Sequence, residues 1–188
     1  ANTVLWAKCK CVQKLGPATR EMIKPWQLHQ LGMQSFIAAE DRRFFCHCGV
    51  DLWGIGRAVV TNLKQCSVRE GAISITQQLA RTVFLSQDRT VTRKLKEAAL
   101  AYKLERQLSK GQILEQYLNF VYLGSSAYGI SDAAWVYFSK QPEELTLPEA
   151  ALIAGMPPAP SLYSPLVNPE IALQRRSIVI SRMEQEGF

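Results

Sequence analysis

Residues 38–51 read AAEDRRFFCHCGVD, in which Glu40 and Asp41 stand directly before two arginines. A further acidic residue, Glu97, lies in RKLKEAALAYKLE (93–105), and the polar stretch GAISITQQLAR (71–81) separates the two acidic segments. Formation of a glycosidic bond requires a base that takes a proton from the attacking hydroxyl and cations that stabilise the departing group. Carboxylates on either side of a polar, cation-rich segment therefore point to sugar-transfer chemistry.

The segment that leads into this stretch predicts a helix from about Trp26 to Glu40. Its apolar residues recur at helical spacing, and Pro25 suits the first turn of a helix. Glu40 would then lie near the C-terminal end of the helix. From the residues alone, the favoured interpretation of Glu40 is a helix-end carboxylate paired with Arg42 or Arg43.

A longer helix is predicted from about residue 92 to residue 108, because this segment is rich in Ala, Leu, Lys and Glu. Arg93 and Glu97 are four residues apart on one face of it, so Glu97 could be no more than a partner of Arg93. The expected apolar face consists of Leu95, Ala98, Ala99 and Tyr102.

Three further helix starts are marked by capping-box spacing, in which Ser or Thr is followed three residues later by Gln or Glu. These pairs are Ser74 with Gln77, Ser109 with Gln112, and Thr146 with Glu149. Strand signals are few, and GMPPAPSLYSP (155–165) is a proline-rich loop. The sequence therefore predicts an all-α fold, and its 188 residues suit one domain.

The chain has a formal net charge of +6 and a pI of about 9.2, which fits an anionic partner. Between Arg81 and Glu97 there are five cations and two acids, so the positive charge is concentrated there. The sequence contains no nucleic-acid-binding motif and no basic stripe with interleaved aromatic residues, so nucleic acid is not the expected partner. The sequence contains no run of about eighteen apolar residues, which a membrane-spanning helix would need.

Five blocks of the sequence, in order, resemble the peptidoglycan glycosyltransferases, the transglycosylase domain of class A penicillin-binding proteins and the monofunctional transglycosylases. The blocks are 38–51, 70–81, 93–105, 113–124 and 133–165. The resemblance implies a lysozyme-like larger lobe and a smaller, membrane-facing lobe around the segment after Asp51. It also implies that residues 1–188 form a single domain, excised from a longer membrane-anchored chain.

The resemblance assigns roles to individual residues. Glu40 is the expected catalytic base, and Glu97 is the expected second active-site carboxylate. The expected substrate and pyrophosphate ligands are Arg43, Phe44, Thr76, Gln77, Gln78, Arg81, Arg89, Arg93 and Arg175. Asp41 and His47 are expected to support the loop, and Tyr117 to pack between helices. Where the family motif usually has a serine, this chain has Ile73, which removes a hydroxyl and puts one expected substrate hydrogen bond in doubt.

The implied reaction is polymerisation of a lipid-linked disaccharide-pentapeptide (lipid II) into β-1,4 glycan strands. Its implied setting is the outer face of the cell membrane, in a chain that could also carry a transpeptidase domain, and a phosphoglycolipid such as moenomycin is an expected inhibitor. The family allows Mg²⁺ or Mn²⁺ but no organic cofactor, and nothing in the sequence forms a complete metal cage. Two alternatives stay open, a lysozyme-like hydrolase and a non-catalytic binder of the lipid-linked substrate.

The chain has five cysteines, at positions 9, 11, 46, 48 and 66, and this odd number does not indicate a secreted disulfide framework. A zinc site is not expected either, because C-x-C lacks the usual C-x2-C spacing.

Four apolar residues are candidates for membrane contact or for ordinary core: Trp53, Ile55, Val59 and Val60.

Overall fold

The computed structural model describes residues 22–23, 28, 30–57, 73–84 and 91–188. All of its regular elements are helical, and the one β-pairing in this part of the chain is an isolated bridge between Tyr122 and Tyr128. The predicted all-α fold is therefore confirmed. None of the described helices is long and apolar enough to cross a membrane.

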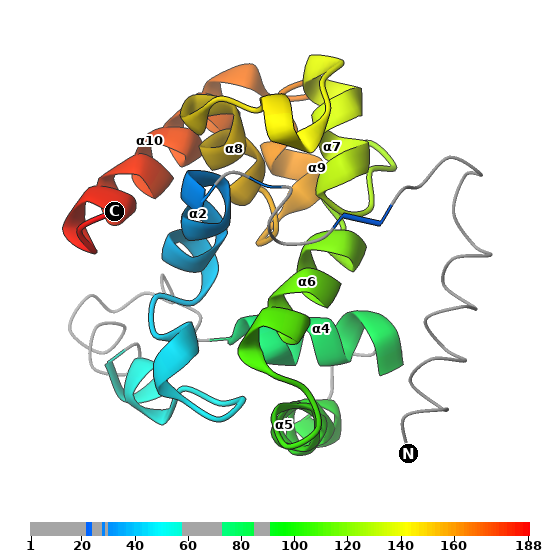
Figure 1. Cartoon of the computed structure of the whole chain (residues 1–188), viewed down its shortest axis with the longest axis vertical. Coiled ribbons are helices and arrows are strands. Elements are labelled where there is room, and N and C mark those ends of the chain that lie inside the picture. The colour runs from blue at the N-terminus through cyan, green and yellow to red at the C-terminus, as the bar shows by residue number, and fades with distance from the viewer. Residues whose placement is uncertain (1–21, 24–27, 29, 58–72, 85–90) are drawn as a thin grey trace.

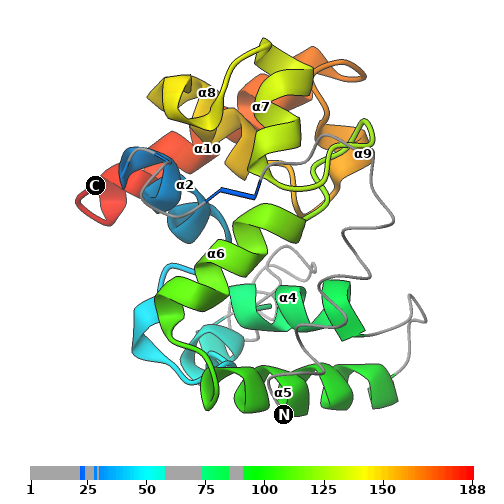
Figure 2. The same ribbon diagram turned by 45° about the vertical axis from the view of Figure 1, so that its right-hand side comes forward.

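The helices form two groups, joined by α6 (Lys110–Phe120), as Figures 1 and 2 show. One group packs α2 (Gln30–Glu40) against α8 (Leu147–Ala154) and α10 (Pro169–Gln185). This group also contains α7 (Ile130–Phe138), η3 (Pro142–Glu144) and α9 (Pro160–Tyr163). The other group packs α4 (Ile75–Phe84) against α5 (Val91–Glu105) and α6, beside the short η2 (Phe44–Cys46).

Helix α2 runs through the core of the first group and carries Glu40 at its last position. Phe36 and Ala38 are fully buried on it. The helix begins at Gln30, later than the expected start near Trp26, which lies outside the described residues. Its end agrees with the prediction, so the carboxylate of interest stands where a buried helix meets an irregular loop.

The predicted capping residues begin their helices as expected. At α4, the Ser74 hydroxyl accepts from the Gln77 N–H and the Gln77 side chain accepts from the Ser74 N–H, both at 3.1 Å. Ser109 and Gln112 make the same reciprocal pair at α6. At α8, Glu149 accepts from the Thr146 N–H at 2.8 Å. These contacts satisfy N–H groups that the first turn of a helix leaves without backbone partners.

The expected apolar face of α5 is wrong. Leu95 and Tyr102 are 68% and 55% exposed, whereas Glu97, Ala101 and Leu104 of this helix are buried. Two contacts set the helix in this rotation. The carboxylate of Glu97 is held by arginines. The backbone of Gly49 also lies against the backbone of Ala101, so close that a Cβ added to Gly49 would lie 2.8 Å from the carbonyl carbon of Ala101. The helix also ends at residue 105, three residues earlier than predicted.

Residues 52–57 are helical and begin the segment that the resemblance assigns to a membrane-facing lobe. Trp53 is 76% exposed and Leu52 is 77% exposed, so these side chains are not core. Ile55 is also exposed. The other two candidates for membrane contact, Val59 and Val60, lie outside the described residues.

Candidate active site

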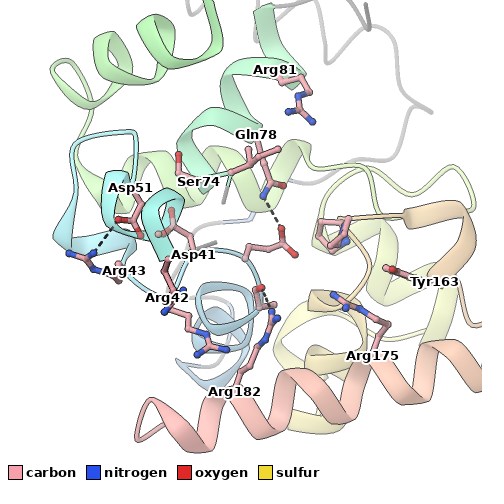
Figure 3. Close-up of a pocket in the computed structure, with 17 residues that line it drawn as sticks. Asp41, Arg42, Arg43, Asp51, Ser74, Gln78, Arg81, Tyr163, Arg175 and Arg182 are labelled. Atoms are coloured by element: carbon pink, nitrogen blue, oxygen red, sulfur yellow. Dashed lines mark hydrogen bonds and ion pairs between the residues drawn. The ribbon is translucent and has the colours of Figure 1, made fainter. Parts of the chain in front are cut away.

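A cleft of about 410 Å³ opens between the two groups of helices, beside the end of α2 (Figure 3). Among the described residues, six arginines and three acids line it. They are Arg42, Arg43, Arg57, Arg81, Arg175, Arg182, Glu40, Asp41 and Asp51. The cleft is therefore cationic, and it suits a substrate that carries negative charge.

Glu40 is partly buried at the edge of this cleft, and its two carboxylate oxygens have different surroundings. Oε2 accepts a hydrogen bond from Nε2 of Gln78 at 2.8 Å, the bond drawn from Gln78 in Figure 3. Oε1 is buried and has no hydrogen-bond partner among the described residues. One oxygen is thus held by Gln78, and the other makes no hydrogen bond within the described part of the chain.

Burial raises the pKa of the Glu40 carboxyl from 4.5 to about 7. The Gln78 hydrogen bond and the positive charges of Arg175 and Arg182 oppose this rise, while the neighbouring Asp41 adds to it. A carboxyl group with a pKa near neutrality is suited to general base catalysis, because it is often ionised yet binds a proton strongly.

Arg175 and Arg182 reach the cleft from α10, on the side opposite α4 (Figure 3). Arg182 donates to the carbonyl of Ala39 at 2.8 Å and so also holds the last turn of α2. Arg175 lies over the ring of Tyr163, 4.8 Å from its centroid, and donates to a backbone carbonyl at residue 155 at 3.3 Å. Each arginine is anchored by a second contact, so its charge is held in place.

Asp41 has a structural position next to the base. It is 6% exposed and accepts from the backbone N–H of Ile75 at 3.1 Å, which ties the loop after α2 to the start of α4. Its two oxygens lie 3.0 and 2.9 Å from Nε2 of His47. The contacts agree with the supporting roles predicted for Asp41 and His47. Arg43 binds Asp51 at 3.2 Å across the same loop.

Glu97 is buried, with 1% of its side chain exposed, and it forms a two-bond ion pair with Arg81 at 2.9 and 3.1 Å. Arg93 lies 3.5 Å from the same carboxylate. Glu97 does not line the cleft, but Arg81 does. Glu97 therefore acts on the cleft indirectly, because it fixes the position of Arg81, which lines the cleft.

The other predicted ligands divide into those that line the cleft and those that do not. Arg43, Gln78, Arg81 and Arg175 line it. Thr76 is buried and donates to Glu105 at 2.6 Å, Gln77 caps α4, and Phe44 is buried beneath Lys110. Arg89 lies outside the described residues. The roles of all these residues remain predictions.

The structure adds residues that the sequence did not single out. Arg42, Arg57 and Tyr163 line the cleft, and so does Arg182. Only Arg182 had a signal in the sequence, since it follows Arg175 by seven residues and so lies on the same face of a helix. The position of Ile73 in the cleft wall agrees with its place in the family motif.

Cys46, the last residue of η2, and Cys48, in the loop after it, are exposed free thiols. In the described part of the chain, no group of three His, Cys, Asp or Glu side chains converges in a way that could hold a metal ion. The remaining cysteines, at positions 9, 11 and 66, lie outside the described residues.

An all-helical fold with one carboxylate near neutral pKa in an arginine-lined cleft suits an enzyme that uses a base on a substrate with negative charge. Comparison with known proteins agrees. The model of a family described as "Transglycosylase" matches residues 8–184. The chain therefore belongs to the transglycosylase family, whose enzyme class is glycosyl transfer.

Similar proteins include penicillin-binding protein 1A of Neisseria lactamica, 48% identical over 98% of this chain, and that of Aquifex aeolicus, 45% identical over all of it. The chain spans 23% and 26% of the lengths of these relatives. A crystal structure of penicillin-binding protein 1A from Haemophilus influenzae superimposes with a TM-score of 0.52 at 26% identity. The superposition covers 90% of this chain and 16% of the Haemophilus influenzae chain. The lysozyme-like fold that the resemblance implied is thereby confirmed.

Proposed function

We propose that this chain polymerises a lipid-linked disaccharide-pentapeptide into β-1,4 glycan strands. The observation that carries the proposal is Glu40, a carboxyl with a pKa of about 7 that has one unpartnered oxygen at an arginine-lined cleft. The donor is the growing chain on undecaprenyl pyrophosphate, and the acceptor is one further lipid-linked disaccharide.

In the proposed reaction, Glu40 takes the proton of the acceptor's 4-hydroxyl as that oxygen attacks the anomeric carbon of the donor. The new bond joins the oxygen to the anomeric carbon, and the bond from that carbon to the pyrophosphate oxygen breaks. Attack opposite to the leaving group inverts an α-linked donor to a β-1,4 product. Undecaprenyl pyrophosphate leaves with the electron pair of the broken bond.

The leaving pyrophosphate needs cations that strengthen their contact as its charge grows. Arg81 is the best supported of the predicted ligands, because it lines the cleft and its guanidinium is fixed by Glu97. Arg175 supplies charge from the opposite wall. Arg93 is already paired with Glu97, so its contribution is to the same fixed cluster.

The hydrolase alternative needs a second carboxylate to activate water or to act as the nucleophile. The other two acids that line the cleft, among the described residues, both have partners. Asp41 is bound to His47 and to a backbone N–H, and Asp51 is bound to Arg43. This arrangement favours sugar transfer, in which an acceptor hydroxyl and a pyrophosphate leaving group make a second carboxylate unnecessary.

The proposed partners are the lipid-linked precursor, the growing glycan strand, the outer surface of the cell membrane and, in the full-length protein, a transpeptidase domain. Exposed Leu52 and Trp53 are candidates for contact with lipid. Mg²⁺ or Mn²⁺ near the acceptor pyrophosphate remains a proposal. In the part of the chain that the structure describes, no three His, Cys, Asp or Glu side chains converge to hold such a cation.

Incubation with labelled lipid-linked disaccharide-pentapeptide tests the proposal. The expected product is a polymer that a muramidase cuts back to disaccharide units. Release of soluble fragments from finished cell wall without polymer formation would support the hydrolase instead. Binding of the precursor without any product would identify a non-catalytic binder.

A further inference from the structure

Tyr117 of α6 is fully buried, and its hydroxyl group is directed at the side chain that contacts the base. The hydroxyl donates to Oε1 of Gln78 at 3.2 Å, while Nε2 of Gln78 donates to Glu40 at 2.8 Å. The tyrosine ring packs edge-to-face on Phe36, with ring centroids 6.3 Å apart. Phe36 is one helical turn before Glu40 on α2. The ring contact thus fixes the hydroxyl relative to the helix that carries the base.

We propose that Tyr117 is a positioning residue for the reaction, which holds the Gln78 amide with its NH₂ group toward Oε2 of Glu40. The proposal rests on the proposed function for its catalytic meaning. The orientation itself is a property of the folded chain.

The amide of Gln78 has two orientations of nearly equal shape, and hydrogen bonds decide between them. In the orientation described, the NH₂ group donates to the carboxylate and the carbonyl accepts from Tyr117. In the reversed orientation the carbonyl would face the carboxylate of Glu40, and the buried hydroxyl of Tyr117 would lose its acceptor. Leaving a buried donor unpaired is costly, so the hydroxyl selects the first orientation.

Tyr117 remains a donor throughout the pH range in which the base titrates. Its burial, with smaller contributions from Glu40 and Asp41, raises the pKa of the phenol well above 10. A buried tyrosine is therefore a more constant orienting group than a histidine would be, since histidine changes its protonation state near neutral pH.

Removal of the hydroxyl should make the reversed orientation accessible. The carbonyl of Gln78 would then accept the proton of the protonated carboxyl of Glu40, which stabilises the protonated form. Loss of this orienting bond therefore raises the pH at which Glu40 ionises. An effect equal to the cost of one unpaired donor corresponds to about one pH unit.

Other charged groups also act on Glu40, and all of them are unchanged in a Tyr117→Phe variant. Helix α8, which also packs against α2, contains one charged side chain, and it is bound to Lys140 and Thr146. The groups that influence the carboxyl are Arg175 and Arg182 of α10 and Asp41 of the adjoining loop.

The test is a titration of the Glu40 carboxyl by ¹³C NMR in protein with labelled glutamate, with the signal assigned by its loss in Glu40→Gln. We expect Tyr117→Phe to raise the midpoint by about one pH unit. The matched control is Tyr137→Phe, which removes a hydrogen bond of 2.8 Å to the carbonyl of Leu123, outside the cleft. It should leave the midpoint unchanged.

A double variant separates positioning from a general loosening of the fold. Gln78→Met should itself raise the midpoint, and adding Tyr117→Phe to it should change nothing further, because the orienting contact is already absent. An unmoved midpoint in folded Tyr117→Phe, or an equal shift in Tyr137→Phe, would overturn the proposal. If Tyr117→Phe does not fold, an unmoved midpoint in Gln78→Met overturns it.

The titration requires no turnover, so a chain that fails to polymerise would refute the proposed function and leave this test intact. In an active chain, the acidic limb of the rate profile should move with the NMR midpoint. A rate profile that stays in place while the midpoint moves would show that Glu40 is not the titrating base.

Discussion

Replacement of Glu40 by Gln should remove activity and at the same time stabilise the fold at neutral pH. The amide preserves the shape of the side chain and can still accept from Gln78, but it cannot take a proton. Loss of a general base costs about a hundredfold to ten-thousandfold in rate. Wild-type turnover should rise with pH and be half-maximal near the Glu40 pKa of about 7.

The effect on stability follows from the same pKa. Between pH 4.5 and about 7 the folded protein binds a proton at Glu40 that an unfolded chain releases. The free energy of unfolding therefore falls as the pH rises through this window. The full difference between the two pKa values corresponds to about 3 kcal/mol, lost from wild type but not from Glu40→Gln.

The assay is urea unfolding of both proteins at several pH values from 4 to 8, together with polymerisation of the labelled precursor. We expect the variant to gain stability relative to wild type as the pH rises, by at most about 3 kcal/mol. Glu170→Gln, an exposed carboxylate on α10, is the matched control and should change neither property. Near-normal turnover by folded Glu40→Gln would refute the assignment of the base. A stability difference that does not depend on pH would refute the role of burial.

Three other outcomes are expected. Binding of a phosphoglycolipid such as moenomycin should weaken with added salt and weaken further in Arg81→Ala. Binding that does not depend on salt would show that the pyrophosphate site has been assigned to the wrong residues. Glu97→Gln should lower both turnover and the free energy of unfolding, by about 1–3 kcal/mol, because two arginines lose their charged partner; indifference in both measurements would contradict this. The Cys46→Ser, Cys48→Ser double variant should keep most of its activity, and elemental analysis that found one zinc per wild-type chain, lost in the variant together with activity, would overturn that expectation.

Local signals in the sequence predicted several helix starts and the last position of α2. Ser74 and Ser109 could be identified as helix starts because a capping box is complete within four residues. The last position of α2 was also predicted, because the apolar helical pattern stops at Glu40 and the charged residues Asp41, Arg42 and Arg43 follow it. Such features depend on neighbours in the chain and need no knowledge of the rest of the fold.

The buried face of α5 could not be predicted in this way. Periodicity identified an apolar stripe that includes Leu95 and Tyr102, but the helix instead turns Glu97 inward. That rotation depends on Arg81, which comes from another helix, and a carboxylate is buried only when such a partner is supplied. The family motif marked Glu97 as important, yet only the folded chain places it behind an arginine and outside the cleft.

The pKa of the base is the result of opposing effects from separate parts of the fold. Exposed at a helix end, Glu40 would titrate near 4.5 and be a weak base; burial alone would keep it protonated at neutral pH. Gln78 of α4 and two arginines of α10 each oppose burial, and these elements approach Glu40 from opposite sides of the cleft (Figure 3). A base near pKa 7 therefore requires both groups of helices to be in place. The base therefore lies where the two groups meet, and the residues that line its cleft come from segments between Ala39 and Arg182, far apart in the sequence.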